Sequence, residues 1–150
     1  MRIMFLILSL ISTSALAHDY QIGEISIAHP ISYPTTGRSG VGYMMITNTG
    51  PQDRLIAVEA DFPRVMIHKT TTVDGIASMT MVHAVDVPQN GMAHFQPGGL
   101  HVMFMGLSAH LMVGDEIPAT LVFENAGRLQ IVFKVEARPD TENAGEHSNH

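Results

Sequence analysis

From about residue 20 to residue 137, the sequence is a series of short apolar or alternating runs separated by turn residues. Alternation with a period of two is typical of a strand with one buried face, and short apolar runs fit buried strands. No run of ten or more residues shows a convincing helical period. We therefore predict a single all-β domain, built as a sandwich or barrel, with strands at 24–27, 42–47, 54–60, 65–68, 79–87, 92–96, 100–105, 119–123 and 129–137.

The first 17 residues differ in kind from the rest of the chain. Arg2 gives a positive start, residues 3–11 form an apolar run, and Ala15-Leu16-Ala17 fits a signal-peptidase site. The run is shorter than the roughly 20 residues of a membrane-spanning helix, although an N-terminal anchor is the alternative. We expect residues 1–17 to be a signal peptide, 18–137 the folded domain and 138–150 a disordered polar tail. The mature protein is then soluble, exported, and without a membrane span.

Composition narrows the possible chemistry. The chain has no cysteine, so neither disulfides nor thiolate ligands are available. The net charge is −6 and no basic stripe is present, which argues against nucleic acid as a partner. The 11 methionines and 9 histidines stand out against only 8 lysines and arginines.

Histidine and methionine share strand faces at three places. In the run 100–105, His101 and Met103 alternate with apolar residues, so they face outward or line a rim. The same alternation pairs Met66 with His68, and it places Met79, Met81 and His83 on one face. Imidazole and thioether together favour Cu(I), whereas Mg²⁺ and Ca²⁺ prefer oxygen, and zinc sites use histidine, cysteine and carboxylate.

The spacing of four of these residues resembles a known motif. Ten residues separate His68 from Met79, and 21 more precede His101, which is followed at the second position by Met103. This spacing and the flanking segments HKTTTVDGIASMTMV and PGGLHVMFMGL resemble the periplasmic copper chaperones called PCu(A)C. The resemblance extends over most of residues 20–137.

The resemblance implies a cupredoxin-like fold and Cu(I) bound by His68, Met79, His101 and Met103. It also implies a periplasmic chaperone, not an enzyme, that delivers copper to an acceptor: a cytochrome c oxidase subunit during assembly of its copper centres, or another copper chaperone. Two features depart from the family pattern. No tryptophan follows His29-Pro30, and Lys69 stands where an acidic residue is common.

Several alternatives remain open from sequence alone. A new N-terminus at His18 could chelate Cu(II), as in a copper enzyme, and His147 and His150 in the tail could bind Cu(II) weakly. An electron-transfer cupredoxin needs a cysteine ligand, which this chain lacks. A structural β-sandwich without metal is a further possibility. The roles of Met81, as a competitor of Met79, and of Met105 are not decided by the pattern.

Overall fold

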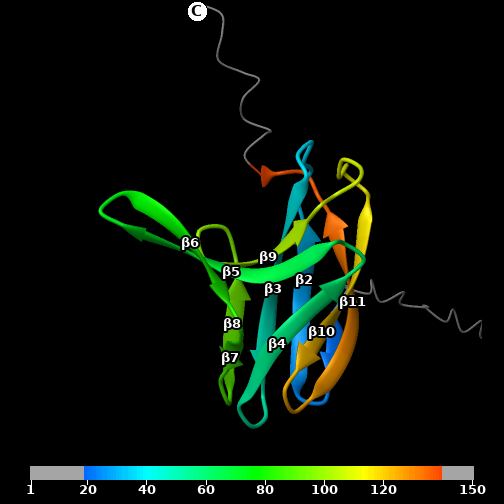
Figure 1. Ribbon diagram of the computed structural model, residues 1–150. Helices are drawn as coiled ribbons and strands as arrows, with labels where there is room; N and C mark the ends of the chain where they lie inside the picture. Colours follow the sequence, from blue (N-terminus) through cyan, green and yellow to red (C-terminus); the bar gives the residue numbers. More distant parts are fainter. Residues whose placement is uncertain (1–18, 140–150) are drawn as a thin grey trace, which may run out of the picture.

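The computed structural model describes residues 19–139, which form eleven β-strands and no α-helix (Figure 1). The predicted leader and residues 140–150 lie outside the described residues, as do the histidines at positions 18, 147 and 150. The strands are β1 (Tyr20–Ile22), β2 (Ile25–Ser32), β3 (Ser39–Asn48), β4 (Asp53–Ala60), β5 (Arg64–Val73), β6 (Ile76–Val82), β7 (Val85–Val87), β8 (Gly91–Phe95), β9 (Leu100–Met105), β10 (Glu116–Phe123) and β11 (Gly127–Val135).

The strands join into one hydrogen-bonded sheet that curls into a nearly closed barrel (Figure 1). The order is β6-β5-β9-β8-β3-β2-β11-β10-β4-β7, with β1 added beside β2. The prediction of an all-β sandwich or barrel is confirmed. Within residues 19–139 no helix has the length and apolarity needed to cross a membrane.

The core follows from alternation along the strands. Every second residue of β3 is buried, and the same is true of β10 and most of β11. The Phe104 and Phe133 rings meet edge to face with centroids 5.4 Å apart, and the Phe62 ring also packs against Phe104, with centroids 5.4 Å apart. Gly42 lies against both Phe104 and Phe133, where a Cβ atom would come within 3.1 Å of each ring.

The hairpin of β5 and β6 projects away from the barrel (Figure 1). It turns at Asp74 and Gly75, whose φ angles are both positive, at 51° and 77°, as a two-residue turn of this type requires. Residues 71–81 are all exposed, and β6 is an edge strand with no charged residue. The outer half of the hairpin therefore contributes little to the core, and β6 presents one free strand edge to the solvent.

Some strand boundaries differ from the prediction. The run 79–87 is two strands, β6 and β7, because the chain bends at residues 83–84 and β7 pairs with β4. The predicted strand 65–68 extends to Val73, and β1 was not predicted. The predicted hairpin connection at 125–127 is confirmed, with a turn before Gly127, whose φ is 97°.

Candidate metal centre

The four predicted ligands lie on three neighbouring strands. Met79 is on β6, His68 on β5, and His101 and Met103 on β9, which are adjacent in the order β6-β5-β9. Two of these strands come from one hairpin, and β9 follows about 20 residues later in the chain. The 21 residues between Met79 and His101 therefore carry the chain from β6, on one side of β5, to β9, on the other side of β5.

Antiparallel register brings the two histidines together. His68 and His101 are direct cross-strand partners, so their side chains leave the same face of the sheet. Their rings meet edge to face with centroids 5.9 Å apart. Ile67 and Val102, the next residues along each strand, are buried in the core. Packing of Ile67 and Val102 in the core thereby fixes the positions of β5 and β9, the strands that carry the two histidines.

His68 also touches Met79. Its Nδ1 atom lies 3.2 Å from the Met79 Sδ atom. Met79 is opposite Thr70 in the hairpin, and Thr70 shares a sheet face with His68, two residues away. Two ligands of one tetrahedral ion, with bonds of about 2.0 Å to nitrogen and 2.3 Å to sulfur, lie about 3.5 Å apart. The observed separation is close to this value.

His101 is the most enclosed of the four side chains. The residue keeps only 4% of its surface exposed, although the alternation along β9 predicted an outward or rim position for it. Its Nδ1–H donates a 3.0 Å hydrogen bond to the Gly99 carbonyl, which also accepts the Thr70 N–H. A proton on Nδ1 leaves a lone pair on Nε2. That Nε2 atom is buried and has no hydrogen-bond partner.

Met103 completes the predicted set. It is two residues beyond His101 on β9, and it is paired in register with Met66 of β5. Its side chain is half-buried. Met103 therefore shares the face of the sheet that carries both histidines.

A lowered pKa keeps His68 neutral, which is the form that binds a metal ion. Burial lowers the pKa of His68 below its ordinary value of 6.5, and the neighbouring His101 lowers this pKa further. A metal-binding imidazole must be neutral, so this shift favours binding near neutral pH. No group of three or more histidine, cysteine, aspartate or glutamate side chains suited to a metal occurs within residues 19–139. Thioethers are the donors that adjoin this histidine pair.

The structure also brings in residues that the motif leaves out. Met81 is the direct partner of His68 on the side away from His101, and Met66 is the direct partner of Met103. The motif leaves Met66 out and leaves the role of Met81, a competitor of Met79, undecided. Alternation alone already placed each of them on this face, but their register with the ligands follows only from the strand pairing. Met105 lies opposite Arg64 and is half-buried at the end of the row.

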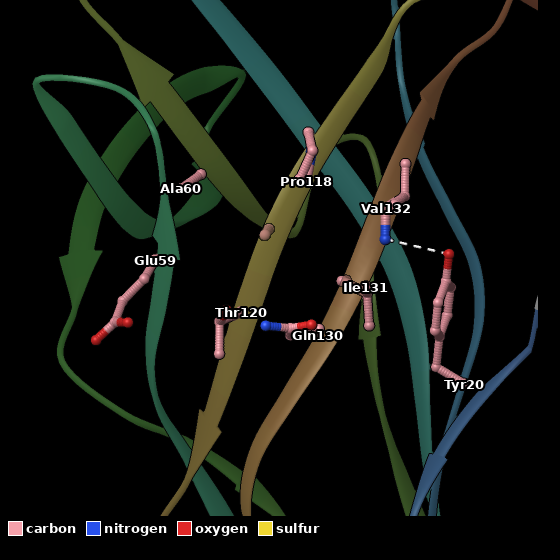
Figure 2. A pocket seen from close by; sticks show the side chains of 9 residues that line it. Tyr20, Glu59, Ala60, Pro118, Thr120, Gln130, Ile131 and Val132 are labelled. Carbon is pink, nitrogen blue, oxygen red and sulfur yellow. Dashed lines mark hydrogen bonds between the residues drawn. The ribbon is translucent and has the colours of Figure 1, made fainter.

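A separate cavity lies on another part of the barrel. It has a volume of about 550 Å³ and is lined by residues of β1, β4, β10 and β11 (Figure 2). At its margin the Val132 N–H donates a 3.2 Å hydrogen bond to the Tyr20 hydroxyl. None of the four predicted ligands lines it, so the cavity is distinct from the candidate metal centre.

Comparison with known proteins places the chain in a family. Residues 24–135 match the family model described as "Putative lipoprotein LpqE-like". The curated "Putative lipoprotein Lxx21020" of Leifsonia xyli subsp. xyli (strain CTCB07) is 29% identical over 93 residues. That match covers 60% of this chain and 56% of the relative, so the chain matches little more than half of that relative's length.

Solved structures agree with the family model. The copper-bound PCuAC domain from PmoF2 is 33% identical, with a TM-score of 0.67, over 81% of this chain and 99% of that domain. The apo PCuAC domain from PmoF1 is 28% identical, with a TM-score of 0.68, over 81% of this chain and all of that domain. The Cu(I) form of DR1885 from Deinococcus radiodurans is 27% identical, with a TM-score of 0.57, over 83% and 85%. The resemblance read from the His-Met motif is thereby confirmed, and the chain belongs to the LpqE-like family, the family of the PCuAC domains.

Proposed function

We propose that this protein binds one Cu(I) ion through His68, Met79, His101 and Met103 and carries it to a copper-accepting protein. The observation that carries the proposal is the buried Nε2 atom of His101, which has no hydrogen-bond partner. Leaving a buried polar atom unpaired costs free energy of about 1–3 kcal/mol. A metal ion bound at that atom removes the penalty, and the neighbouring donors are those that Cu(I) prefers.

The chemistry of the donors suits a carrier. Two imidazoles and two thioethers are neutral, so binding expels no thiol proton. Without a cysteine in the chain, the carrier has no thiol to oxidise in an oxidising compartment. The copper-bound PmoF2 domain and the Cu(I) form of DR1885 show that similar domains hold copper.

The graded exposure of the ligands supports release by stepwise exchange. His101 is 4% exposed, whereas Met79 is 55% exposed on the edge strand of the projecting hairpin. An acceptor therefore reaches Met79 first and replaces its thioether with a ligand of its own. The imidazole of His68 is replaced next, and the buried His101 is the last ligand to release the copper ion.

The cellular setting of the proposal rests on the leader-like N-terminus and on the named relatives. The family and the Leifsonia relative are described as lipoproteins, which agrees with an exported protein. We place the protein in the periplasm, as a chaperone and not an enzyme. Its acceptor is a cytochrome c oxidase subunit under assembly, or another copper chaperone.

Competition with a Cu(I) chelator tests the copper site. The variant His101→Ala/Met103→Ala is expected to lower Cu(I) affinity by more than about 100-fold, because residues that merely support a ligand already contribute about 10–100-fold. Met92→Ala/His94→Ala is the matched control, since it removes an exposed methionine and histidine two residues apart on β8. Unchanged Cu(I) affinity in His101→Ala/Met103→Ala would contradict the assignment of the four-residue site. An unmodified protein that binds no copper would favour a structural β-sandwich.

A further inference from the structure

We propose that Met66, Met81 and His83 form a second position for a soft metal ion, Cu(I) or Ag(I), beside the four-residue site. The three residues line one pocket of about 170 Å³, together with six apolar residues of β4, β5 and β6. The pocket opens where β6 ends and the chain bends, next to residues 56–58 of β4. The proposal deepens the proposed function because it adds a place for the same cargo next to the same face.

Strand register fixes the relation between the two positions. Met81 is the direct partner of His68, and Met66 is the direct partner of Met103. Directly opposed residues of an antiparallel pair have Cβ atoms about 4.5–5.5 Å apart. Each methionine of the second position therefore lies on the strand next to a ligand of the first position, directly opposite it: Met81 opposite His68, and Met66 opposite Met103. A copper ion can pass between them by replacing one ligand at a time.

The donor chemistry selects the ion. Two thioethers and one imidazole are soft or intermediate and carry no charge, which favours a monovalent soft ion over Zn²⁺, Mg²⁺ or Ca²⁺. The pocket wall includes Ile56 and Val58 and no carboxylate.

A packing role explains Met81 poorly. Its side chain is 46% exposed, on a strand whose residues are nearly all exposed. A methionine that serves the core gains its stability by being buried. Met81 instead is the register partner of His68 and lines the pocket, where a thioether can serve as a metal ligand. His83 is likewise exposed and lines the same pocket.

An anaerobic Cu(I) titration of the purified protein, labelled with carbon-13 at the methionine methyl groups, tests the inference. The first equivalent is expected to shift the methyl signals of Met79 and Met103. A second, weaker equivalent is expected to shift those of Met66 and Met81. A protein that takes up only one equivalent, or a second equivalent that moves neither methyl, overturns the second position.

Variants separate the two positions. Met66→Leu/Met81→Leu/His83→Gln is expected to lose the second equivalent and keep the first. The control Met92→Leu/Met112→Leu/His94→Gln removes the same donor types from exposed sites elsewhere and is expected to keep both. Loss of the second equivalent in the control as well would show scattered surface binding and contradict the proposal.

The proposed function can fail independently. His101→Ala/Met103→Ala is expected to lose the first equivalent and retain binding that shifts Met66 and Met81. If this variant keeps both equivalents, the four-residue assignment fails while the second position stands. Should the triple variant not fold, Met81→Leu alone, at an exposed position, is expected to abolish the Met66 shift that accompanies the second equivalent; a Met66 shift that persists at the second equivalent overturns the proposal.

Discussion

At the scale of single residues, the imidazole of His101 is fixed through one nitrogen and left open at the other. The Gly99 carbonyl holds Nδ1, while Nε2 stays buried without a partner. Supporting hydrogen bonds of this kind set the tautomer and orientation of metal-binding histidines. Gly99 is the last residue of the turn Pro97-Gly98-Gly99, which leads directly into β9. The same turn thus positions both the strand and the ring.

His68 should remain neutral at a lower pH than an ordinary histidine. Burial is the main cause of its lowered pKa and His101 the second, so His101→Ala is expected to raise this pKa only part of the way towards 6.5. Because the folded pKa is below the unfolded one, the contribution of neutral His68 to stability is present above pH 6.5 and is lost as the pH falls. Proton NMR titration of the metal-free protein measures the pKa directly. A value at or above 6.5 would contradict the environment described for the ring.

At the scale of elements, β9 is the strand that the sequence predicted best. Its bounds match because its apolar face packs against the core and leaves a clear alternation. The β5–β6 hairpin was predicted poorly because neither face of its outer half is buried. Residues 69–78 therefore carry no hydrophobic period, and only Asp74-Gly75 marks the turn.

The anchor of β9 can be tested at Gly106. This residue follows the strand with φ at 81°, and a Cβ atom there would lie 2.8 Å from the Pro63 ring. Gly106→Ala is expected to cost about 2–4 kcal/mol of unfolding free energy, because backbone strain and overpacking add. Gly114→Ala is the control, with φ at 96° and open space around the position, and is expected to cost about 1–2 kcal/mol. Equal losses for the two variants in urea denaturation would refute the packing argument.

At the scale of the whole molecule, the barrel sets the site by pairing strands that are distant in the sequence. The motif predicted which side chains group together, and alternation predicted which faces they share. Neither could predict that Met81 opposes His68, or that Met66 opposes Met103, because register depends on pairings across the whole sheet. The burial of His101 could not be predicted either, since it depends on the ring of His68 and the turn at Gly99.

Asp53 links the start of β4 to the turn between β10 and β11. Its carboxylate accepts hydrogen bonds from the N–H groups of Arg54, Asn125 and Ala126 at 2.7–2.9 Å. Burial raises the pKa of Asp53, but these hydrogen bonds outweigh it and hold the pKa below 3.8. Asp53→Asn is expected to lower the unfolding free energy at pH 7 by about 2 kcal/mol.

The effect of Asp53 depends on pH with a definite sign. Its contribution is present above the unfolded pKa of 3.8 and is lost as the pH falls through the lower folded value. The gap between wild type and Asp53→Asn should therefore narrow in acid, as followed by urea denaturation. Asp86→Asn breaks only the exposed pair with Arg54 and is expected to change stability by about 0.5 kcal/mol. A gap that stays constant down to the lowest pH would contradict the role of the carboxylate.

X-ray absorption spectroscopy of the protein loaded with one equivalent of Cu(I) tests the central claim most directly, because it counts sulfur and nitrogen ligands on the metal. The proposed site of His68, Met79, His101 and Met103 predicts two sulfur and two nitrogen scatterers, with a loss of sulfur in Met79→Leu and of nitrogen in His101→Ala. A first shell of nitrogen and oxygen alone, without sulfur, would contradict it.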